Sequence, residues 1–143
     1  MNTQSALRKL ASMSASQAPA LDAIALQLAA ALDAYDRDAA AMVARWPDTE
    51  LYRGLGEQLE KIRMYSNALP AAGVQWVELL IAHAELMHQL WQAQSGGTAY
   101  GRAQLAARRD RHADCVLALR NRCLQLVAQA GRHNTLLPEG ESP

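Results

Sequence analysis

The sequence predicts an all-α protein, an antiparallel four-helix bundle, from three observations. Half of the residues are apolar, most of them Ala and Leu, which are the best helix formers, and Phe is absent. The β-branched and aromatic residues that strands favour are sparse, and no stretch sustains a two-residue alternation. Apolar residues recur instead at three- and four-residue steps, which is typical of helices with a buried stripe.

The N-terminal 18 residues predict a short, weakly held helix, because their apolar face is small and chain ends are often poorly held. A long helix is expected from Pro19, a good helix-start residue, to Trp46. One seam of this helix repeats every seven residues, as in bundle helices. Its members are Leu21, Leu28, Tyr35 and Met42.

The Trp-Pro-Asp turn at residues 46–48 separates the first long helix from the second. Asp48 is a plausible N-cap, and the second helix is expected to run to about Leu69. Gly54 and Gly56 fall in its first turns, where each glycine costs roughly 1 kcal/mol relative to Ala. They indicate either a late start of the helix or a bulky tryptophan lying against bare backbone.

The stretch from Gly73 to Trp91 predicts a central helix that is apolar nearly all round. One face holds Val74, Val77, Leu80, Ile81, Ala84, Met87, His88 and Trp91. The second face holds Trp76, Leu79, His83, Leu86 and Leu90. A helix of this kind is normally buried, so we expect the other helices to cover it on two sides.

The last helix is expected over residues 99–130, capped by Thr98 and ended by Gly131. The bundle domain would then occupy residues 19–131. The tail, residues 132–143, carries Pro, Gly, Glu and Ser and is expected to be disordered.

Cysteine usage and the absence of an apolar leader predict a cytoplasmic protein. Cys115 and Cys123 would lie roughly 12 Å apart on one helix. A disulfide needs a Cα separation below about 7 Å, so both thiols should be free, as in a reducing cytosol. No apolar run is long enough to cross a membrane. The frequent use of Ala and Arg is typical of a GC-rich bacterial genome.

The central helix carries a weak metal-binding motif. Glu85 and His88 have the Glu-x-x-His spacing of di-iron bundles, and His112 is a third candidate ligand. The di-iron site needs this motif twice, with a Glu from each of two other helices, and the chain carries it once. The sequence therefore predicts no metal and no cofactor. A ligand- or metal-binding bundle that uses His83 with these three residues stays as an alternative.

Catalysis is not predicted. Cys115 and His112 have the composition of a nucleophile and a base, but no third residue orients the base and no oxyanion-hole loop is recognisable. The three histidines of the central and last helices lie on apolar faces, where they could act as a pH switch or as hydrogen-bonded core residues. We expect the second role.

A nucleic-acid-associated protein is the other alternative, because the last helix is basic. Its charged residues are Arg102, Arg108, Arg109, Arg111, Arg120 and Arg122 against Asp110 and Asp114. The net charge of the chain is zero, however, so its total charge does not favour nucleic acid or an anionic membrane. We expect these arginines to pair with the acidic residues near Asp33 in the first long helix.

An interaction role remains as the leading hypothesis. The two-faced central helix carries more apolar surface than one small bundle can bury, and leftover apolar surface usually marks a partner site. We expect a non-enzymatic adaptor, chaperone-like or regulatory module that binds another protein and forms a homodimer. The residues expected at the interface are Trp76, Leu79, His83, Leu86 and Leu90.

Overall fold

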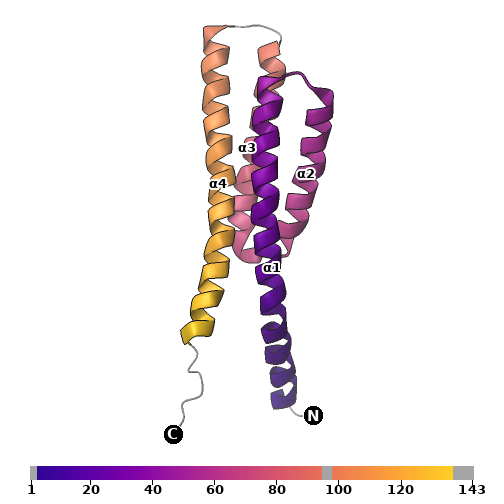
Figure 1. Ribbon diagram of the computed structural model, residues 1–143, viewed down its shortest axis with the longest axis vertical. Helices are drawn as coiled ribbons and strands as arrows, with labels where there is room; N and C mark the ends of the chain where they lie inside the picture. Colours follow the sequence, from indigo (N-terminus) through magenta and orange to yellow (C-terminus); the bar gives the residue numbers. More distant parts are fainter. Residues whose placement is uncertain (1–2, 95–97, 137–143) are drawn as a thin grey trace.

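A computed structural model describes the backbone of residues 3–94 and 98–136, and the side chains of residues 19–93 and 98–131. Within these ranges the chain forms four helices and no strand: α1 (Thr3–Ala44), α2 (Thr49–Asn67), α3 (Gly73–Gln94) and α4 (Ala99–Leu136). A 3-10 turn, η1 (Pro70–Ala72), joins α2 to α3. Figure 1 shows successive helices running in opposite directions, so the predicted antiparallel bundle is confirmed.

The four helices do not pack equally against one another. α1 packs closely on both α2 and α4, and α3 packs closely on α4, whereas α2 and α3 make only slight contact. The seam between α2 and α3 is therefore the loosest between helices that follow one another in the chain. As a result, α3 receives most of its cover from the side of α4.

The core runs along the centre of the bundle, and all four helices contribute to it. Three members of the predicted seven-residue seam, Leu28, Tyr35 and Met42, are fully buried, while Leu21 at the end of the seam is exposed. The other fully buried large side chains are Leu32, Leu55, Ile62, Leu79, Leu86, Leu90, Leu119 and Cys123. Aliphatic side chains thus supply most of the core, as the composition predicts.

Two predicted helix ends are wrong. Pro19 lies inside α1, which begins at Thr3, so no break separates residues 3–18 from the long helix. A proline removes one backbone hydrogen bond at a cost of about 3 kcal/mol, and the helix-forming alanines on either side of Pro19 favour continuation. Gly131 likewise lies inside α4, where a glycine costs only about 1 kcal/mol. Residues 132–136 are therefore helical, and residues 137–143 lie outside the described part.

The start of α2 follows the predicted cap. Asp48 Oδ1 accepts hydrogen bonds from the backbone N–H groups of Glu50 and Leu51, each at 3.1 Å. The helix begins at once, so Gly54 and Gly56 lie within it. A Cβ atom added at either glycine would meet nothing within 4 Å, so both explanations offered for these glycines are wrong. Neither glycine lies against a packed neighbour, and a glycine is tolerated at such positions.

Removing the cap of α2 should destabilise the fold. Asp48→Ala is expected to lower the free energy of unfolding by about 1 kcal/mol, because two N-terminal N–H groups lose their acceptor. Asp48→Ser, which keeps an acceptor oxygen, should stay close to the parent protein. Urea unfolding of the three proteins measures the difference, and equal midpoints for the Ala and Ser variants would contradict the role of the cap.

Candidate interaction surface on helix α3

The predicted interface residues lie in the interior of the chain's own bundle. Leu79, Leu86 and Leu90 are almost completely buried, and Trp76 is only 7% exposed. His83, the fifth residue of this set, is partly buried. This face of α3 therefore packs against the other helices of the same chain.

Most of the opposite face of α3 is exposed and forms a continuous stripe, although Met87, which the sequence places on this face, is buried. Four of its members are Val74, Val77, Ile81 and Trp91, with exposed fractions of 68%, 50%, 46% and 48%. The members of this α3 stripe are Val74, Val77, Ile81, Ala84, His88 and Trp91, all of them exposed. The expectation that other helices cover α3 on two sides is thus wrong, because α2 packs on α1 and barely reaches α3.

Aromatic side chains flank one end of the α3 stripe, on the side of α2. The Trp91 ring meets Trp46 edge to face, with 4.7 Å between ring centroids. Tyr52 of α2 lies 6.0 Å from the same ring, also edge to face. Leu80 continues this edge along α3 and is 41% exposed. The edge of the stripe that faces α2 is therefore apolar.

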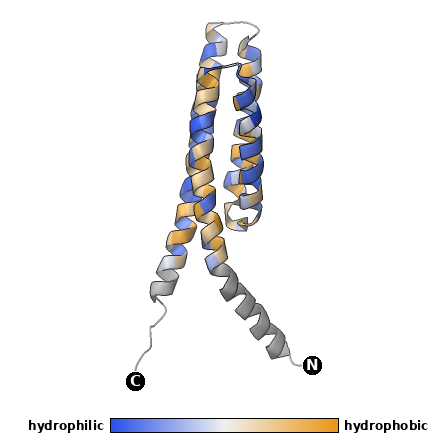
Figure 2. Ribbon diagram, turned by 45° about the vertical axis from the view of Figure 1, so that its right-hand side comes forward, coloured by the Kyte–Doolittle hydropathy of each residue, from blue (hydrophilic) through white to orange (hydrophobic). Residues whose placement is uncertain are grey.

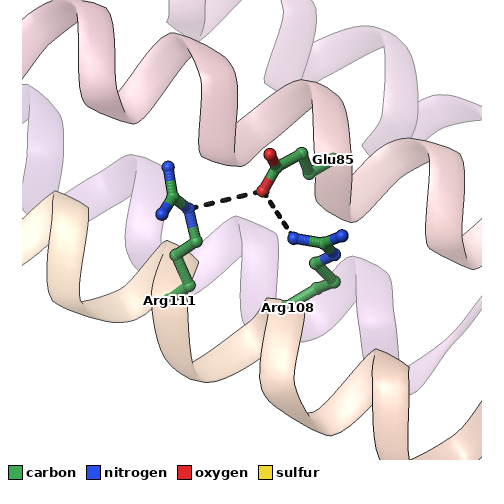
Figure 3. A network of polar contacts seen from close by, with 3 residues as sticks. All are labelled: Glu85, Arg108 and Arg111. Atoms are coloured by element: carbon green, nitrogen blue, oxygen red, sulfur yellow. Dashed lines mark hydrogen bonds and ion pairs between the residues drawn. The ribbon is translucent and has the colours of Figure 1, made fainter.

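Charged side chains flank the α3 stripe on the side of α4. Glu85 Oε2 accepts a hydrogen bond from Arg108 Nη1 at 2.9 Å and lies 3.3 Å from Arg111 Nε. Figure 3 shows both guanidinium groups of α4 converging on this one carboxylate of α3. The pairs are about 33–50% exposed, so each contributes modestly to stability, and together they fix the side of α3 that faces α4.

The metal candidates are not brought together. Glu85 is held by two arginines, His88 belongs to the exposed stripe, and His112 is buried on α4. The described part of the chain contains no group of three or more His, Cys, Asp or Glu placed to hold a metal ion. The cavity beside His112 measures about 100 Å³, below the roughly 300 Å³ of small ligand pockets.

His83 and His112 serve as hydrogen-bonded core residues, as expected, whereas the same expectation is wrong for His88, which is exposed. The Tyr35 hydroxyl lies 2.6 Å from His83 Nδ1 and 2.7 Å from His112 Nε2. Burial lowers the pKa of both imidazoles, in the case of His112 to about 4, with the neighbouring His83 as a second cause. Burial also raises the pKa of the Tyr35 hydroxyl. The cluster is therefore uncharged at neutral pH and ties α1, α3 and α4 together.

The arginines of α4 largely meet partners within the chain. Arg120 Nε lies 2.8 Å from Asp33 Oδ1, so the expected pairing with the acidic residues of α1 is confirmed for Arg120, whereas Arg108 and Arg111 pair with Glu85 of α3 instead. Arg122 Nε donates to the backbone carbonyl of Ala71 at 3.0 Å. With the two arginines on Glu85, four of the six arginines between residues 99 and 130 hold α4 to its neighbours.

The two cysteines are free, as predicted, but only Cys123 is buried. Burial raises the pKa of both thiols, in the case of Cys123 to about 11. A raised pKa lowers the thiolate fraction, and the thiolate is the reactive form. The Nε2 atom of His112 that could serve as a base is engaged with Tyr35.

Comparison with known proteins finds no matching family model, no matching curated protein and no matching solved structure. No helix in the described ranges is long and apolar enough to cross a membrane, and Figure 2 shows polar residues interrupting the apolar ones along the coloured helices.

Proposed function

We propose that this protein is a non-enzymatic interaction module that binds a second copy of itself through the α3 stripe. The observation that carries the proposal is the exposure of this stripe. Six residues at consecutive three- and four-residue steps leave an uninterrupted seam on the outer face of α3, and it contains no Asp, Glu, Lys or Arg.

The size of the exposed surface supports a docking role. Four members of the stripe are 46–68% exposed, and the largest apolar patch of a monomer, roughly 300–600 Å², is often functional. Leu80 and Tyr52, both about two-fifths exposed, extend the stripe toward α2. A standard interface takes roughly 800 Å² from each partner, so we expect pairing to use these flanking residues as well as the stripe.

The nature of the surface favours another apolar helix face over the two alternatives. Nucleic acid needs available positive charge, and most arginines of α4 already pair within the chain. A bound small molecule needs a concave site, and the hollows beside His112, of about 100 Å³, and between Leu21, Leu69 and Leu126, of about 230 Å³, both lie below the roughly 300 Å³ of small ligand pockets. A second copy of the chain supplies a surface of matching chemistry and length, and a two-fold pair buries the same patch on both partners.

Native mass spectrometry, without added metal or chelator, tests the proposal. The parent protein should appear as an unliganded dimer in the micromolar range, and Ile81→Glu should convert it to a folded monomer. The substitution places a charge at the centre of the stripe, where pairing would bury it without a partner.

Leu117→Glu is the matched control for this experiment. Leu117 lies on α4 and is 53% exposed, close to the 46% of Ile81, so the same charge is introduced at similar exposure away from the stripe. This variant should remain dimeric. A monomeric parent protein, or equal loss of dimer in both variants, would overturn the proposal, and added mass from a metal or small molecule would favour the ligand-binding alternative.

A further inference from the structure

We infer that the two copies pair through their α3 helices in antiparallel orientation, with a two-fold axis that passes midway between Ile81 and Ala84. This inference rests on the proposed self-association and specifies its geometry. It follows from the spacing of the stripe, the sizes of its side chains and the character of its two edges.

The spacing of the stripe is that of a coiled-coil seam. From Val74 to Trp91 the steps alternate between three and four residues, as at the a and d positions of a heptad repeat. An antiparallel pair centred on the midpoint matches every member with another. Val74 meets the partner's Trp91, Val77 meets the partner's His88, and Ile81 meets the partner's Ala84.

The sizes of the side chains favour this orientation. In each antiparallel layer a larger side chain lies opposite a smaller one, so the layers differ little in volume. A parallel pair would place Ala84 opposite the partner's Ala84 and Trp91 opposite the partner's Trp91, leaving a void at one level and crowding at another. Close-packed interiors tolerate neither voids nor overpacking.

The two edges of the stripe also favour this orientation. A two-fold axis perpendicular to antiparallel helices brings like edges together, whereas parallel pairing opposes unlike edges. The edge with Leu80 then meets the same apolar edge of the partner copy. The edge toward α4 carries Glu78 and Glu85, and the two arginines that lie on Glu85, Arg108 and Arg111, balance these carboxylates, so two such edges can meet without a net charge.

Site-directed disulfide formation tests the orientation. Two single-cysteine additions, Val77→Cys and His88→Cys, are made in a Cys115→Ser background, which leaves the buried Cys123 as the only native thiol. In an antiparallel pair these two positions share a layer. Each lies about 16 Å along the helix from its own twin, well beyond the Cα separation of about 7 Å that a disulfide allows.

The expected result is a disulfide-linked dimer only when the two variants are mixed, allowed to exchange subunits and then oxidised. Each variant alone, and the background protein, should stay uncross-linked. Disulfide formation in either variant alone at the level of the mixture would overturn the antiparallel geometry and leave self-association intact. Native mass spectra of the same samples show dimer content, so dimers that never cross-link would overturn the geometry, and monomers throughout would overturn self-association itself.

Discussion

Lowering the pH from 7 to 4 should destabilise the fold by about 3 kcal/mol through His112, whose pKa in the folded protein is about 4 against an ordinary value of 6.5. Because the folded state disfavours the protonated imidazole, the unfolded chain binds more protons below pH 6.5. Stability is therefore complete above pH 6.5 and declines as the pH falls toward 4. His83, with a pKa lowered by burial, adds to the effect in the same direction.

Urea unfolding at fixed protein concentration between pH 7 and pH 4 measures this loss. Carboxylates also titrate near the acid end, so the informative quantity is the difference between proteins at each pH. His112→Gln removes the titrating ring and keeps a group that can bond to Tyr35, so it should flatten the pH dependence. A pH dependence in His112→Gln equal to that of the parent protein would rule out His112 as the source.

Leu79→Ala should lower the free energy of unfolding by about 2–5 kcal/mol, because the side chain is fully buried and its removal leaves a cavity. The adjacent Leu80, 41% exposed, is the matched control: the same truncation there should cost less than about 1 kcal/mol. Both residues are leucines at adjacent positions of α3, and they differ in which face of the helix they occupy.

Chemical unfolding at neutral pH compares the two leucine variants directly. A large gap is expected between their midpoints, with similar slopes against denaturant concentration, because both retain the same fold. Similar losses in the two variants would contradict the division of α3 into a buried face and an exposed stripe. Circular dichroism before unfolding checks that helix content is unchanged.

Features fixed by nearby residues could be predicted from the sequence. The Asp48 cap acts on N–H groups two and three residues away, and Thr98 likewise accepts a hydrogen bond from Gly101 N–H at 3.0 Å. The apolar faces of α3 also follow from spacing along one helix. Which face turns inward depends on where α2 lies, and that depends on its packing against α1. Local periodicity contains no such information.

The contacts that define the candidate site's surroundings join residues far apart in the chain. In the sequence Tyr35 is an ordinary member of an apolar seam, yet its hydroxyl lies within hydrogen-bond distance of the imidazoles of His83 and His112, 48 and 77 residues later. Glu85 was a metal candidate because His88 follows at a ligand spacing, but arginines of α4 take its carboxylate. The helix boundaries predicted at Pro19 and Gly131 are wrong because one proline or glycine does not decide where a helix ends, and α1 and α4 continue through these residues.

The Tyr35 hydroxyl, placed between two ring nitrogens, imposes an ordered arrangement of hydrogens. A neutral phenol carries one proton, so it can donate to only one of the two imidazoles and must accept from the other. Because His83 faces Tyr35 with Nδ1 and His112 with Nε2, one ring presents a lone pair and the other an N–H only if both rings are the same tautomer, protonated on Nδ1 in both or on Nε2 in both. The direction of the chain of hydrogen bonds can reverse only if both rings change tautomer together, so the interior of this bundle holds a polarised chain of hydrogen bonds with no charge on any member.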